Sequence, residues 1–122
     1  PSAKRAYRFG QIVRKAIESW DSDKRVAVFA SGGMSHFVID EEFDRKFVGA
    51  LKQRDKDFLT AIPLKELQSG TSELKSWISL AGLLEDSKAE MNEIDYVPCY
   101  RSPAGTVRFS PFSTSTRSEP RV

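Results

Sequence analysis

The chain of 122 residues has the length of one domain or of a piece of a larger one, and its 39% hydrophobic and 30% charged residues fit a globular protein. Its net charge of +2 comes entirely from residues 107–122, so no concentrated positive face is expected, which excludes a nucleic-acid-binding protein. No run reaches the roughly 18 apolar residues of a membrane span. The single cysteine, Cys99, rules out an internal disulfide and predicts a reducing, cytoplasmic location.

Helix and strand patterns alternate in the first half of the chain. Residues 5–20 carry apolar side chains at spacings of three and four, which predicts an amphipathic helix with one buried face. Residues 25–30 are apolar enough to be buried on both faces, which predicts a strand of a parallel sheet. Asp40 is the expected N-cap of a second helix over residues 41–53. The apolar stripe expected on the first helix consists of Phe9, Ile12, Val13, Ala16, Ile17 and Trp20.

The second half of the chain is more irregular. Residues 55–68 predict short helical pieces interrupted at Pro63, which suits a first helical position. A third helix is expected over residues 72–84, and a second strand over residues 93–100. Residues 107–122, rich in Ser, Thr, Arg and Pro, are expected to form a disordered tail.

These elements predict an α/β fold with an incomplete sheet flanked by helices. Two apolar strands that pair only with each other would leave open sheet edges. We therefore expect a further segment of a longer protein, or a second copy of the chain, to complete the sheet. The first residue, Pro1, is not methionine, which favours a processed or excised product.

The one histidine, His36, is the first candidate for chemistry. It follows the predicted strand 25–30 after a Gly-Gly pair, and ligands of open α/β folds bind just outside the carboxyl ends of strands. An imidazole can take up and return a proton near neutral pH, so His36 is a candidate general acid and base. Gly33 and the glycine before it would let a ligand approach the backbone. The alternative is a purely structural loop histidine.

Glu73 is the second candidate. It is expected in the first turn of the third helix, where the helix dipole stabilises a carboxylate, and that role alone would explain it. The alternative is a metal ligand, since one carboxylate and two histidines form a facial triad for iron(II). This chain cannot supply the two histidines, and a four-ligand zinc site of Cys and His is likewise impossible.

Other chemically interesting residues have simpler interpretations. Trp77 is expected in the core, and Cys99 is expected to be an inert buried thiol. Tyr100 and Arg101 follow the second predicted strand and could bind an anionic substrate or have a structural role. A group of acidic residues near His36 is expected to be solvated at a helix start: Asp40, Glu41, Glu42 and Asp44.

Three segments together resemble one enzyme family. They are FASGGMSHF at residues 29–37, SGTSELKSWI at 69–78 and DYVPCYRSPAGT at 95–106. They are similar to the C-terminal part of the class III extradiol ring-cleavage dioxygenases, of the type of the catalytic (beta) subunit of protocatechuate 4,5-dioxygenase and of gallate dioxygenase. The resemblance covers residues 7–106.

The resemblance implies an iron(II) enzyme that opens a catechol-type, protocatechuate- or gallate-like aromatic ring with O2. It implies that Glu73 is the carboxylate ligand of the iron and that His36 is the acid/base histidine. It also implies supporting or substrate-binding roles for Ser35, Gly33, Tyr100 and Arg101.

The family's two iron-binding histidines lie in an N-terminal half that this chain lacks. We therefore expect residues 1–106 to be the C-terminal portion of a dioxygenase domain, inactive without that segment or another subunit, and oligomeric. Aromatic compound catabolism would be its role. One alternative is a non-catalytic interaction module, or a truncated relative, that has lost the iron site. Another is a small acid/base enzyme that uses His36 alone.

Overall fold

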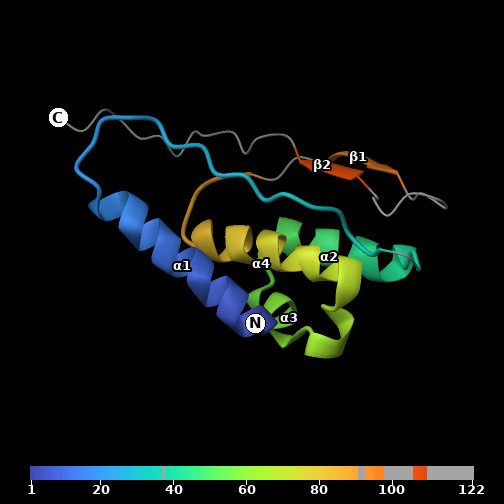
Figure 1. The fold of residues 1–122 in the computed structure, drawn as a ribbon. Helices are drawn as coiled ribbons and strands as arrows, with labels where there is room; N and C mark the ends of the chain where they lie inside the picture. The colour runs from blue at the N-terminus through green and yellow to red at the C-terminus, as the bar shows by residue number, and fades with distance from the viewer. Residues whose placement is uncertain (37, 91–92, 98–105, 110–122) are drawn as a thin grey trace.

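In the computed structural model the backbone is described for residues 1–36, 38–90, 93–97 and 106–109, and the side chains for the first two ranges. This part of the chain is mainly helical (Figure 1). None of its helices is long and apolar enough to cross a membrane. The elements in chain order are α1 (Ala3–Ser19), α2 (Glu41–Gln53), α3 (Lys56–Ala61), the 3₁₀ turns η1 (Leu64–Glu66) and η2 (Ser69–Glu73), α4 (Leu74–Leu83), β1 (Glu93–Val97) and β2 (Thr106–Phe109).

The helical core forms where α1 packs across α4, and Figure 1 shows the two helices crossing. Their backbones approach closely because each helix presents a glycine to the other. A Cβ atom on Gly10 would lie 1.8 Å from the carbonyl oxygen of Ser79, and one on Gly82 would lie 2.0 Å from that of Tyr7. The largest fully buried apolar side chains of the described part are Phe47, Met34, Leu59, Leu67, Leu74 and Ile78.

The buried face of α1 differs from the predicted one. Phe9, Ile12 and Trp20 were expected to be buried, and they are 61%, 56% and 51% exposed. The apolar periodicity locates a helix correctly, but the distance between two helices depends on the side chains at their contact. Small residues allow α1 to approach α4 closely, so the face of α1 that carries them is the buried one. The buried residues of α1 are Ala3, Ala6, Tyr7 and Gly10.

The predicted α/β fold with an incomplete sheet flanked by helices is wrong. Residues 25–30 have no strand structure, and the side chain of Phe29 among them is 83% exposed. A strand requires a neighbour for its backbone groups, and no backbone hydrogen bond joins residues 25–30 to another described segment. The described strands are β1 and β2, which pair antiparallel with each other. Helices therefore pack on helices and not on the faces of a parallel sheet.

The other predicted helices agree more closely with the structure. α2 follows its N-cap Asp40, whose side chain accepts a hydrogen bond from the backbone N–H of Phe43 at 2.9 Å. Pro63 interrupts the helical pieces expected over residues 55–68, as the N-cap of η1 and not as its first residue. The third predicted helix is divided into η2 and α4, which begins at Leu74.

The C-terminal strands overlap two further predictions. β1 covers the first five residues of the strand expected over 93–100, and the rest of that range lies outside the described residues. β2 includes residues 107–109 of the tail expected over 107–122, and residues 110–122 lie outside the described residues. The pairing runs from Glu93 opposite Phe109 to Val97 opposite Thr106.

Arg54 connects the end of α2 with the chain that leaves α4. Its backbone is left-handed, with φ 56°, which turns the chain out of α2. Its guanidinium donates hydrogen bonds to the carbonyl oxygens of Leu84, Glu85, Ser87 and Ala89. Because the last carbonyls of a helix have no partner within it, Arg54 stabilises the end of α4 and the segment that follows.

Candidate active site

The loop that carries His36 requires a glycine at position 32. Gly32 has φ 115°, a conformation that side-chain-bearing residues rarely adopt. A Cβ atom there would also lie 2.6 Å from both the Cβ and Oε2 atoms of Glu73. Gly32 therefore permits both the turn of the loop and its close approach to Glu73.

Glu73 lies where η2 ends and α4 begins, and its side chain makes no hydrogen bond that caps the helix. Its Oε2 atom instead accepts a hydrogen bond from the backbone N–H of Gly33 at 2.7 Å. The same oxygen lies 3.3 Å from Nε2 of His36, and the Glu73 side chain is 46% exposed. The structure thus brings the two principal candidates of the sequence into contact.

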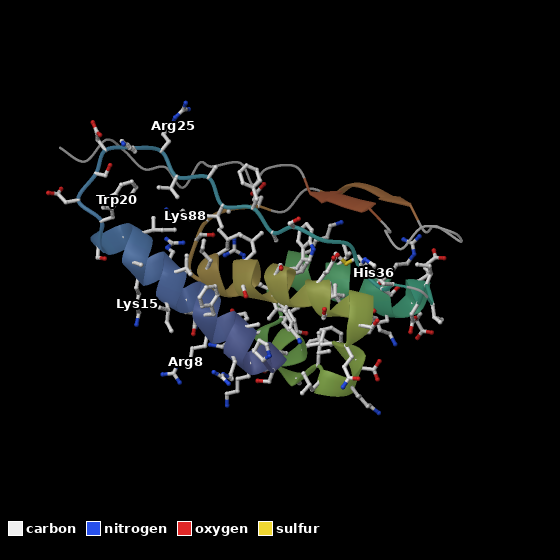
Figure 2. All side chains as sticks on the ribbon, viewed as in Figure 1. Arg8, Lys15, Trp20, Arg25, His36 and Lys88 are labelled. Carbon is white, nitrogen blue, oxygen red and sulfur yellow. The ribbon has the colours of Figure 1, made fainter. Side chains whose placement is uncertain are left out.

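The His36 imidazole is held on more than one side. Its Nδ1 atom lies 2.7 Å from the carbonyl oxygen of Met34, an acceptor, so Nδ1 carries the proton and Nε2 faces Glu73. Its backbone N–H donates to the hydroxyl of Thr71 at 3.2 Å. Only 7% of the side chain is exposed. Figure 2 shows His36 beside the start of α2. His36 is at one end of the extended segment that joins α1 to α2, and Trp20 and Arg25 are at the other end.

Ser35 and Asp44 form a second pair beneath the loop. Asp44 was expected to be solvated with its acidic neighbours, and this prediction is wrong because only 1% of the residue is exposed. Its carboxylate accepts hydrogen bonds from the backbone N–H of Ser35 at 2.9 Å and from the Ser35 hydroxyl at 2.8 Å. The sequence contained the signal: Asp44 precedes Phe47, Val48 and Leu51 at helical spacings on the inner face of α2.

Trp77 is buried, as predicted, but it also touches the loop. Its indole Nε1–H donates a hydrogen bond to the carbonyl oxygen of Gly32 at 3.0 Å. The loop is thereby anchored to α4, the helix that begins at Glu73. Tyr100 and Arg101, the other predicted substrate-binding residues, lie outside the described residues.

A cavity of about 480 Å³ adjoins the site without including it. His36 and Glu73 do not line it. Its lining consists of Tyr7, Leu59 and Trp77, residues near the ends of α2 and α4, and residues 88–90. The clearest pKa changes also fall outside the site. Burial, with a contribution from Glu85, raises the pKa of Tyr7 to about 12. A hydrogen bond from Lys56, and a second from Gln11, lower the pKa of Glu85.

The described residues supply only part of a metal centre. A facial triad requires three protein ligands, and no group of three His, Cys, Asp or Glu side chains suited to a metal ion occurs in residues 1–36 and 38–90. Glu73 has one suitable oxygen: Oε2 contacts Gly33 and His36, while Oε1 makes no hydrogen bond to a described residue. The donor type therefore fits iron(II), but the donor number does not.

Sequence comparison identifies the class of protein to which this loop and carboxylate belong. Residues 1–110 match the family described as the catalytic LigB subunit of aromatic ring-opening dioxygenase. The chain belongs to this family, which confirms the resemblance to the extradiol dioxygenases.

A particular relative is a gallate dioxygenase of Pseudomonas putida KT2440. It is 33% identical over 109 residues, which cover 80% of this chain and 32% of the relative. The chain thus spans about a third of the length of this curated relative.

Proposed function

We propose that this chain supplies the proton-handling histidine and one metal-binding carboxylate of an aromatic ring-opening dioxygenase. The observation that carries the proposal is the contact between His36 Nε2 and Glu73 Oε2 at 3.3 Å, in a loop that Gly32 and Trp77 hold in place. The substrate would be a catechol-type ring, protocatechuate- or gallate-like, and the co-substrate O2. The name of the Pseudomonas putida relative favours gallate.

In this proposal His36 moves protons. Because the carbonyl of Met34 accepts the Nδ1–H, Nε2 is the nitrogen that would take a proton from a phenolic hydroxyl of the substrate. Glu73 lies beside it and stabilises the imidazolium that results. Because the imidazole is almost fully buried, the proton stays close to the reacting ring until it is returned.

The Glu73 carboxylate would hold iron(II) through Oε1, the oxygen that the loop does not use. When bound, the metal would bring the catechol oxygens and O2 together. The remaining ligands, implied to be two histidines, must come from outside this chain, either from an N-terminal segment or from another subunit. Residues 1–106 are then the C-terminal portion of the catalytic domain, with Tyr100 and Arg101 as substrate-binding residues.

The direct test is a chimera in which residues 1–110 replace the matching third of the Pseudomonas putida gallate dioxygenase. We expect O2-dependent ring opening of gallate or protocatechuate. His36→Ala should lower kcat at least about 100-fold with iron retained, whereas Glu73→Ala should lower both activity and iron content. Glu42→Gln, an exposed carboxylate of α2, is the matched control. Full activity of both site variants would overturn the assignment.

A second candidate function is a non-catalytic interaction module. It is favoured by the absence of a three-ligand group within the described side chains. Anaerobic titration of the chimera with iron(II) separates the two candidates, because tight one-to-one binding there would contradict the interaction module. Such binding should also disappear in Glu73→Ala.

A further inference from the structure

Asp44 differs from the other carboxylates at the start of α2. Glu41 and Glu42 are solvent-exposed and pair with Arg45 and Lys46 one turn further along the helix. Asp44 is 1% exposed and turns toward the loop before the helix. Burying a carboxylate is costly unless strong hydrogen bonds compensate it, so its contacts are informative.

Two of those contacts are hydrogen bonds to a single residue, Ser35. Oδ1 of Asp44 accepts the backbone N–H of Ser35 at 2.9 Å, and Oδ2 accepts its hydroxyl at 2.8 Å. The hydroxyl oxygen in turn accepts the backbone N–H of Asp40 at 2.8 Å. Two charge-assisted bonds from one carboxylate to one residue define both its position and its orientation. Ser35 is therefore fixed to the first turn of α2.

His36 is the next residue, and two single hydrogen bonds also hold it. Its backbone N–H donates to Thr71 of η2 at 3.2 Å, and its Nδ1–H donates to the carbonyl of Met34 at 2.7 Å. The imidazole thus lies between two anchors, one on α2 through Ser35 and one on η2. Movement of either anchor would change the distance from Nε2 to Glu73.

We propose that Asp44, acting through Ser35, is a positioning residue that holds the His36 imidazole against Glu73. The position of the imidazole against Glu73 is argued from the structure alone. Its importance for ring opening rests on the proposed function. Asp44 is argued to act through Ser35, so it is a positioning residue and not a catalytic one.

The single histidine makes a direct test possible, because a chain labelled with ¹⁵N-histidine gives one set of imidazole NMR signals. The wild type should show a proton on Nδ1 that exchanges slowly with water, because the carbonyl of Met34 accepts it. Ser35→Ala removes the hydroxyl but keeps the backbone bond to Asp44. Asp44→Asn keeps the shape but leaves one acceptor oxygen for two donors.

Both variants should exchange the Nδ1 proton at least about tenfold faster than the wild type, with shifted ring signals. Far-UV circular dichroism under the same conditions establishes that the helices are intact, and Glu42→Gln is the control that should leave the signals unchanged. If Asp44→Asn does not fold, Ser35→Ala alone decides. Wild-type signals and exchange in a folded Ser35→Ala chain would overturn the proposal.

Activity of the chimera separates this inference from the proposed function. If Ser35→Ala loosens the imidazole and ring opening is unchanged, the positioning role is correct and the role of His36 in catalysis is wrong. If ring opening requires His36 but Ser35→Ala leaves the imidazole signals unchanged, the proposed function stands and the positioning role fails.

Discussion

Gly32 shows how one residue without a side chain permits a site to form. The left-handed backbone at this position turns the loop so that the peptide after it donates to Glu73, and the missing Cβ leaves room for the carboxylate. The carbonyl of the same residue accepts the Trp77 indole N–H. Three contacts of the candidate site therefore depend on a position that contributes no functional group.

Gly32→Ala should displace Glu73 and destabilise the chain. The backbone conformation alone costs about 1–3 kcal/mol for a residue with a side chain, and the steric overlap with Glu73 adds to it. The control is Gly49→Ala in α2, where a Cβ meets nothing within 4 Å and should stabilise the helix by about 0.5–1 kcal/mol. Urea unfolding measures both. Equal stability of Gly32→Ala and wild type would contradict the geometry of the loop.

The pH dependence of stability should show the contribution of the ion pair between Glu85 and Lys56. The pKa of Glu85 is lowered from 4.5 mainly by the hydrogen bond from Lys56, so its contribution to stability is present above pH 4.5 and is lost as pH falls through the folded-state value. In Glu85→Gln and in Lys56→Ala, we expect the free energy of unfolding to fall less below pH 4.5 than it does in the wild type. Unfolding in urea from pH 6 to pH 3 gives the comparison. An acid limb unchanged in both variants would show that the ion pair contributes nothing.

At the scale of elements, the sequence predicted where helices lie better than what they pack against. The N-cap Asp40 and the break at Pro63 are local signals, because each depends on hydrogen bonds or ring geometry within a few residues, and both are confirmed. The inward face of α1 depends on α4, whose glycine lies far along the chain. Residues 25–30 likewise have a strand-like composition, but a strand requires a partner that composition does not reveal.

The crossing of α1 and α4 should tolerate no added side chain at its centre. In Gly10→Ala the new Cβ would overlap the carbonyl oxygen of Ser79 in the α4 backbone, which cannot rotate away. We expect a loss of stability at or above the upper end of the about 1–3 kcal/mol that overpacking usually costs. Gly49→Ala again provides the control. Retention of wild-type stability in urea would mean that the helices are further apart than described.

For the whole molecule, the site was predicted in part. His36 and Glu73 were singled out from their positions and given roles by the resemblance, and the structure adds their contact while the roles stay predictions. Asp44 was missed because acidic residues at a helix start are usually solvated, and only its register with Phe47 distinguished it. The predicted fold class was wrong because the apolar segment 25–30 was taken as a strand of a parallel sheet, and this segment forms no strand.

The largest exposed apolar side chains should determine solubility without determining stability. Phe29 and Phe9 are 83% and 61% exposed, so Phe29→Ser with Phe9→Lys should raise solubility and change the free energy of unfolding by at most about 0.5 kcal/mol. Phe47→Ser, at a fully buried position, should cost about 3–5 kcal/mol. Sedimentation and urea unfolding measure the two effects. A loss in the first variant as large as that of Phe47→Ser would contradict the described exposure.

Because Trp77 donates a hydrogen bond to Gly32, its fluorescence can report the position of the loop that carries His36. The chain has two tryptophans, and Trp20 is half exposed while Trp77 is buried with its indole N–H bonded to a carbonyl. In Trp20→Phe the remaining fluorescence reports that single bond. A shift of its emission to longer wavelength, or easier quenching by acrylamide, would then record the loop leaving α4 in real time, before any substrate or metal is added.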